Sequence, residues 1–207
     1  MTDYIIFGVT YGFAAAAQPG PFQTFIISQT LINGWRKTLP ASFAPLLSDG
    51  PIIILVLIVL STMPAWLIKI LQIGGGLLLL YLAYNACKAW REYDLNVNLR
   101  EKKTDQTLLK ATFVNILNPN AYIGWSLIMG PLFIRGYNET PANGIALIVS
   151  FYSILILGMA GIILIFGMAK NLGPKVTRIT LGLSSIALAG FGFFQLWLGL
   201  NAWEIFS

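Results

Sequence analysis

Proline follows a side-chain amide at two places inside long apolar stretches of this 207-residue chain. The first place is Gln18-Pro19-Gly20-Pro21 and the second is Asn118-Pro119-Asn120. Because proline has no backbone N–H, it leaves a carbonyl about one helical turn upstream without its donor. Such a carbonyl attracts an ammonium group, and the N-terminus of the following half-helix attracts a carboxylate. The residues of both motifs are therefore candidate contacts for a small molecule that carries both charges, such as an amino acid.

A simple kink is the other interpretation, since proline can bend a membrane helix without binding anything. Two features favour a functional role. Pro19 and Pro119 are 100 positions apart, close to half the chain, and each is followed within a few residues by aromatic side chains. The pattern therefore indicates a duplicated unit with a matching break in each half.

Asp49 is the one acidic residue that lies well inside an apolar stretch. An ionised carboxylate at the centre of a bilayer costs at least ~2.5–3.5 kcal/mol, so such residues usually face a cavity and serve ion or proton movement. Asp49 could hold either a proton or a substrate ammonium group. The alternatives are a structural cap for a helix break near Pro51 and a position closer to the membrane surface.

The composition places the chain among integral membrane proteins. Hydrophobic residues make up 57% of it and charged residues 10%, whereas a soluble domain has roughly 25% charged residues. At about 20 residues for each transmembrane helix, the chain has room for about six helices. The apolar segments are residues 4–32, 39–60, 66–87, 111–134, 143–168 and 179–203. We therefore predict an all-α protein with six transmembrane helices, the first and fourth of them broken at proline.

The predicted helices form a single domain over residues 1–207. Repeat 1 covers about residues 1–87, a polar cytoplasmic loop covers about 88–110, and repeat 2 covers about 111–207. Because each repeat has an odd number of helices, the second inserts upside down relative to the first. Inverted repeats with paired broken helices are typical of secondary transporters that bind their substrate near the midplane.

The positive charges predict the orientation. Lys and Arg concentrate in alternate connections: Arg36, Lys37, Lys88, Arg91, Arg100, Lys102, Lys103, Lys110, Lys170, Lys175 and Arg178. Cytoplasmic loops collect these residues, so both termini should lie outside a cytoplasmic (inner) membrane. The net charge of +5 then reflects cytoplasmic loops, and no nucleic-acid partner is expected. Because the start of the chain has no positive side chain, we also expect an uncleaved first helix rather than a signal peptide.

Several kinds of chemistry are excluded by missing residues. The chain has no histidine and one cysteine, Cys87, so it cannot form an internal disulfide or a nucleophile–histidine pair. We predict no enzyme activity, no cofactor and no metal site. A divalent metal cation exporter remains the alternative function, although one buried carboxylate is few for a hard cation. Gly8 and Gly12 are spaced for close helix packing, with a homodimer contact as a second possibility.

The motifs together resemble the LysE/RhtB family of amino acid exporters. The resemblance rests on "QPGP" from Gln18, "SDG" from Ser48 and "NPN" from Asn118, and it extends over essentially the whole chain in length, helix count and polar middle loop. It implies a six-helix inner-membrane exporter of amino acids, basic or small neutral, or of their analogues, driven by the proton gradient. Asp49 is then the candidate proton-coupling residue, with amino acids, protons and the lipid bilayer as partners. The chain departs from the family at Asn120, where lysine is common.

Overall fold

The computed structural model describes residues 1–59, 65–91, 107–169 and 174–205, and these contain helices and short connections but no β-strand. The all-α prediction is confirmed. In chain order the elements are α1 (Thr2–Ala17), α2 (Pro21–Asn33), α3 (Trp35–Thr38), η1 (Leu39–Phe43), α4 (Ala44–Val59), α5 (Ala65–Arg91), α6 (Thr107–Ile116), α7 (Pro119–Gly124), η2 (Trp125–Met129), α8 (Gly130–Glu139), α9 (Pro141–Ala169) and α10 (Pro174–Ile205).

Four helical stretches among the described residues are long and apolar enough to cross a membrane. They are Trp35–Val56, Lys69–Arg91, Pro141–Met168 and Lys175–Asn201. These stretches correspond to the second, third, fifth and sixth predicted spans. The first and fourth predicted spans are each divided into shorter helices, because the chain leaves the helical conformation before a proline in both.

The first division separates α1 from α2. Gln18 has extended backbone angles (φ −63°, ψ 120°), and α2 begins with Pro21, a position where a missing N–H removes no helical hydrogen bond. Pro19 has no N–H to offer the Ala15 carbonyl. That carbonyl instead accepts a hydrogen bond of 2.9 Å from the side-chain amide Nε2 of Gln23. The predicted freed carbonyl is thus present, and a side chain of the next helix satisfies it.

The second division separates α6 from α7. Asn118 is extended (φ −88°, ψ 109°), and its side-chain Oδ1 caps the new helix by accepting from the backbone N–H of Asn120 at 3.2 Å. Asparagine is among the favoured N-cap residues for this reason. Directly after α7 comes η2, a π-helical turn of five residues that leads into α8.

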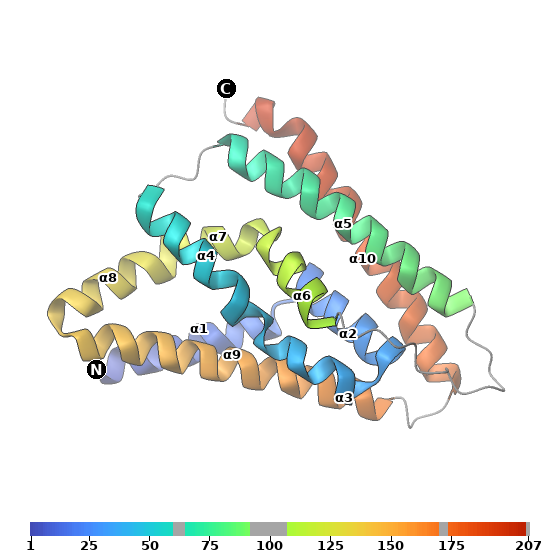
Figure 1. The fold of residues 1–207 in the computed structure, drawn as a ribbon, viewed down its shortest axis with the longest axis horizontal. Coiled ribbons are helices and arrows are strands. Elements are labelled where there is room, and N and C mark those ends of the chain that lie inside the picture. Colours follow the sequence, from blue (N-terminus) through green and yellow to red (C-terminus); the bar gives the residue numbers. More distant parts are fainter. Residues whose placement is uncertain (60–64, 92–106, 170–173, 206–207) are drawn as a thin grey trace.

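Two helix pairs organise the molecule (Figure 1). In the first pair, α1 runs parallel to α9. A Cβ on Gly12 would lie 2.6 Å from the backbone oxygen of Phe151, and one on Gly8 would collide with the Ser150 hydroxyl. The glycine spacing therefore serves close helix packing within the chain, as predicted. A homodimer contact stays a prediction.

In the second pair, α5 runs antiparallel to α10 (Figure 1). Glycines again allow the approach, since a Cβ on Gly76 would lie 2.9 Å from the backbone oxygen of Gly192. The other helices lie on one side of this pair, with α2 making the main contact to α10. Between the two pairs, α4 packs along α6 and brings the buried part of the second predicted span next to the second break.

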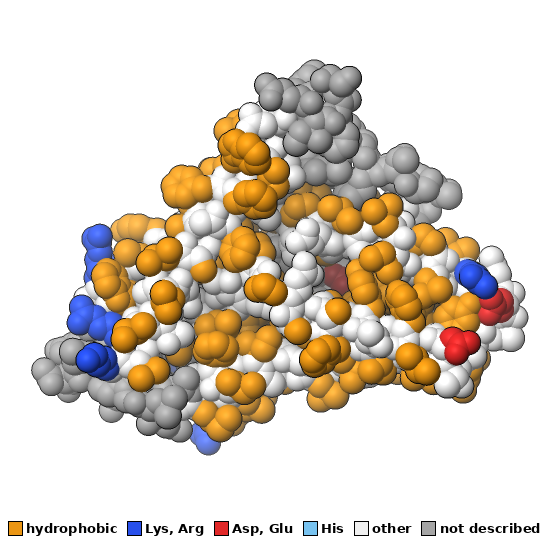
Figure 2. Space-filling model, turned by 180° about the vertical axis from the view of Figure 1, so that it is seen from behind, with side chains coloured by type: hydrophobic (Ala, Val, Ile, Leu, Met, Phe, Trp, Pro, Cys, Tyr) orange, Lys and Arg blue, Asp and Glu red, His pale blue; other side chains and the backbone are white. Residues whose placement is uncertain are grey.

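The surface separates apolar and charged residues (Figure 2). Apolar side chains cover most of the middle, where an acidic side chain shows in a hollow; Lys and Arg gather at one end, and acidic side chains with one Lys or Arg appear at the other. At the corner between α8 and α9, Glu139 accepts hydrogen bonds of 3.3 Å from both Arg135 and Asn143. A further hydrogen bond from the Tyr4 hydroxyl holds the pKa of the Glu139 carboxyl below its ordinary value.

The helices on either side of the middle loop are longer than predicted. Residues 88–91 belong to α5 and residues 107–110 belong to α6, although both sets were expected in the loop. The rest of that loop, residues 92–106, lies outside the described residues.

Candidate functional site

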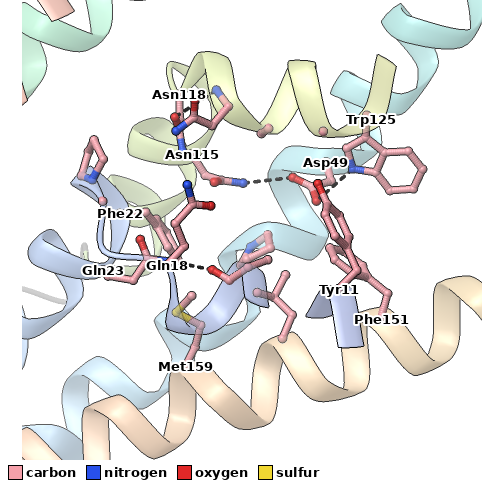
Figure 3. Close-up of a pocket in the computed structure, with 18 of the residues that line it drawn as sticks. Tyr11, Gln18, Phe22, Gln23, Asp49, Asn115, Asn118, Trp125, Phe151 and Met159 are labelled. Carbon is pink, nitrogen blue, oxygen red and sulfur yellow. Dashed lines mark hydrogen bonds between the residues drawn. The ribbon is translucent and has the colours of Figure 1, made fainter. Parts of the chain in front are cut away.

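A cavity of about 120 Å³ lies between the two breaks (Figure 3). Its walls come from α1, α2, α4, α9 and the broken segment from α6 to η2. A water molecule needs about 10–15 Å³ by a comparable measure, so the cavity can hold a small solute with some water. Elements from both halves of the chain therefore surround one cavity.

The predicted site residues surround this cavity with one exception. Gln18, Pro19, Gly20 and Pro21 line it from the first break, Asn118 and Asn120 line it from the second, and Asp49 lines it from α4. Pro119 is buried at the start of α7 and does not line the cavity. Its position indicates that it shapes the break without facing a ligand.

Asp49 is 4% exposed and is the centre of a hydrogen-bond network. Its Oδ1 accepts from Asn115 Nδ2 at 2.9 Å and from its neighbour Ser48 at 3.3 Å. Its Oδ2 accepts from the Tyr152 hydroxyl at 2.8 Å and from Trp125 Nε1 at 3.3 Å. Figure 3 shows the Asn115 and Trp125 side chains pointing to this carboxylate from two directions.

Burying a carboxylate is costly unless hydrogen bonds replace its water. Four donors do so for Asp49, and three of them come from other elements, namely α6, η2 and α9. The carboxylate therefore ties α4 to its neighbours. Because α4 continues through Pro51, there is no break at that position, and the interpretation of Asp49 as a cap is wrong.

The cavity wall contains both polar and apolar side chains. Asp49 is the only Asp, Glu, Lys or Arg among the lining residues, and the remaining polar side chains are mostly amides. The larger apolar side chains in the lining include Phe22, Met129, Phe151, Leu155 and Met159. Such a chamber suits a molecule with a polar head and an apolar or short side chain, and it holds no side-chain cation for an anion.

Four members of the Asp49 network were not predicted as site residues: Ser48, Asn115, Trp125 and Tyr152. Asn115 could have been included, since it is a polar residue one turn before Asn118 in the same apolar segment. Tyr152 carried no signal, and Trp125 entered the prediction only as one of the aromatic residues that follow the second break, because aromatic residues are ordinary in apolar helices. Tyr152 is also 103 residues from Asp49 in sequence, so only the fold reveals their contact.

Metal ligands do not gather in the part of the chain that the structure describes. No group of three or more His, Cys, Asp and Glu residues lies close enough there to hold a metal ion. The divalent-cation alternative thus has Asp49 and neutral amides as its available ligands, and no observation of the cavity favours it.

Comparison with protein families gave a match over most of the chain. The model described as LysE type translocator matches residues 13–199, a range that includes both breaks and Asp49. Comparisons with curated proteins and with solved structures gave no match.

Proposed function

Because the chain belongs to the LysE type translocator family, we propose that it is a secondary transporter that exports amino acids or their analogues from the cell by proton antiport. The observation that carries this proposal is the amide-lined cavity between two broken helices, with a single buried carboxylate in its wall. A membrane transporter needs such a chamber where substrate and proton can meet away from lipid.

The proposed architecture has six spans in two inverted repeats. The broken segments α1–α2 and α6–α8 supply the first and fourth spans. Their packing supports this assignment: the first span runs parallel to the fifth (α9), and the fourth runs parallel to the second (α4). If the two repeats are exchanged, the first span replaces the fourth and the fifth span replaces the second, so the first–fifth pair becomes the fourth–second pair. The pair of the third and sixth spans, α5 and α10, is unchanged by the exchange.

The proposed location is the cytoplasmic membrane, with both termini outside. The supporting observation is the separation of charge in Figure 2, since the end rich in Lys and Arg belongs on the cytoplasmic side by the positive-inside rule. Arg36, Lys88 and Arg178 all lie close to helix ends that would face the cytoplasm.

Asp49 is the proposed coupling residue. When ionised, its carboxylate accepts all four hydrogen bonds and attracts the ammonium group of a substrate. When it gains a proton, its O–H needs an acceptor, and one oxygen can no longer serve two donors. Substrate and proton therefore compete for the same group, which is the exchange that an antiporter requires.

The substrate class follows from the cavity lining. The ammonium group of an amino acid fits beside Asp49, and its carboxylate fits the N-terminus of α2, where no side chain caps the first N–H groups. A single carboxylate in the lining serves one ammonium group, which is sufficient for a small neutral amino acid. A basic amino acid would have to place its second cation against amides or in water.

The test is efflux from cells that are preloaded with amino acids supplied as dipeptides. Wild type is compared with Asp49→Asn, which keeps the shape and removes the negative charge. Asp3→Asn is the matched control, because Asp3 is exposed at the start of α1. We expect wild type and the control to export one or a few amino acids, and Asp49→Asn to lose export while reaching the membrane in equal amount.

Two results would contradict the proposal. Normal export by Asp49→Asn would place coupling elsewhere. Protection of cells against a divalent metal, without movement of any amino acid, would favour the metal exporter instead.

A further inference from the structure

The second break leaves a backbone carbonyl without a donor. In a continuous helix the N–H of Ala121 would donate to the carbonyl of Leu117, but here it donates to Asn118 at 3.2 Å. Among the described residues, none of the backbone N–H groups that form bonds outside the regular helices donates to the Leu117 carbonyl. An unpaired carbonyl in an apolar environment costs free energy comparable to a lost hydrogen bond, so a donor is expected next to it.

A side-chain amide lies at that carbonyl. Gln195 of α10 is 6% exposed, and its Oε1 has no hydrogen-bond partner. A Cβ on Gly75 would lie 2.5 Å from Gln195 Oε1 and 2.6 Å from the Leu117 oxygen. The amide and the carbonyl thus approach the same point on α5, and the absence of a side chain at Gly75 gives them the space.

The orientation of the amide decides what this contact is. Gln195 Oε1 and the Leu117 oxygen are both acceptors, so no hydrogen bond can join them in this orientation. Turning the carboxamide by 180° exchanges Oε1 for Nε2, which has two N–H donors. The first break offers a parallel, because there the amide Nε2 of Gln23 donates to the freed carbonyl of Ala15.

We propose that the Gln195 carboxamide donates to the Leu117 carbonyl and acts as a positioning residue for the second break. This inference rests on the proposed function for its importance in transport, although the hydrogen bond itself does not depend on it. The bond attaches the end of α6 to the α5–α10 pair. It thereby fixes the place from which Asn118 and Asn120 enter the cavity.

Glycine substitutions provide a matched test. Gly75→Ala would push a methyl group against both oxygens, whereas a Cβ on the adjacent Gly74 would meet only a Leu117 side-chain carbon at 3.6 Å. A cysteine introduced by Ala121→Cys reports on the break, because Ala121 lines the cavity. The native thiol is removed by Cys87→Ser, and the rate of maleimide labelling is measured on purified protein.

We expect Gly75→Ala and Gln195→Leu to raise the labelling rate about tenfold, as loss of one buried hydrogen bond would, and Gly74→Ala to leave it near the parent rate. In liposomes the first two variants should lower amino acid efflux by a similar factor. Labelling needs no substrate, so it tests the hydrogen bond even where no amino acid is exported.

Gln195→Glu adds a signature that packing alone cannot give. A carboxylic acid donates through its O–H only when protonated, so labelling should approach the parent rate near about pH 4 and rise relative to it near about pH 8. Parent-like labelling at both pH values, or equal effects of Gly74→Ala and Gly75→Ala, would overturn the proposal. Tighter protection of Gln195→Glu at high pH with added Na⁺ would also overturn it, because a cation between two oxygens would then be the better explanation.

Discussion

Replacing Tyr152 by phenylalanine removes one donor from Asp49 and little else. The hydroxyl lies 2.8 Å from Asp49 Oδ2, and the residue is 8% exposed. The edge-to-face contact of its ring with Phe151, at a centroid distance of 5.0 Å, is available to phenylalanine as well. The hydroxyl also lies within hydrogen-bonding reach of Trp125, so the main loss in this variant is the hydrogen bond to the carboxylate.

The expected size follows from that bond. A hydrogen bond to a charged group contributes about 1.5–3 kcal/mol. At about 2–4 °C per kcal/mol for a chain of this size, Tyr152→Phe should lower the thermal midpoint in detergent by about 3–12 °C. If the bond exists in only one of the transporter's conformations, the equilibrium between conformations should shift by about 10- to 100-fold.

The assay combines thermal unfolding with amino acid efflux. Tyr84→Phe is the control, because Tyr84 is 67% exposed on α5 and its hydroxyl lies away from the Asp49 network. The same Tyr152→Phe change is then made in the Asp49→Asn background, where the acceptor is neutral and the loss should be smaller. An equal loss in both backgrounds would refute the reasoning, since Tyr152 would then act independently of the Asp49 charge.

Other predictions concern packing and the outer corner. Gly8→Ala should separate α1 from α9 and destabilise the protein by about 1–3 kcal/mol through overpacking, measured by thermal unfolding. Gly161→Ala on α9 meets open space and should be neutral or stabilise by up to about 1 kcal/mol; equal effects of the two would contradict the packing argument. Because its pKa is depressed in the folded protein, Glu139 stabilises the fold above its ordinary pKa, and this contribution is lost as the pH falls through the folded value. Glu139→Gln should therefore weaken the acid dependence of unfolding, and an unchanged pH profile would exclude this role.

The sequence was most informative at residues that are energetically unfavourable in an apolar helix. Asp49 and the proline breaks are costly in an apolar helix, so their presence alone indicated a cavity. Helix α1 ends at Ala17 and α6 ends at Ile116, because the proline that follows each end has no backbone N–H with which to continue the helix. These features are local, and local chemistry is sufficient to predict them.

The partners of Asp49 could not be predicted in the same way. Trp125 and Tyr152 are aromatic residues in helices that already contain many aromatic residues. Such helices have no polar stripe, so the sequence does not indicate which of their faces is turned toward the protein interior. Gly8 and Gly12 predicted that α1 packs closely against another helix, but they did not indicate that this helix is α9. Long-range pairing in an apolar protein depends on shape, and shape complementarity has no simple sequence period.

The π-helical turn at Trp125–Met129 has a consequence for comparing the two halves of the chain. A π turn contains one residue more than the α-helix it interrupts, and one residue corresponds to a rotation of about 100°. Up to Trp125, the two halves can be aligned with the 100-position offset that relates Pro19 to Pro119. In the first half, α2 (Pro21–Asn33) is a continuous α-helix over the positions 100 residues earlier, so α8 after Met129 is rotated by about 100° about its axis relative to the end of α2.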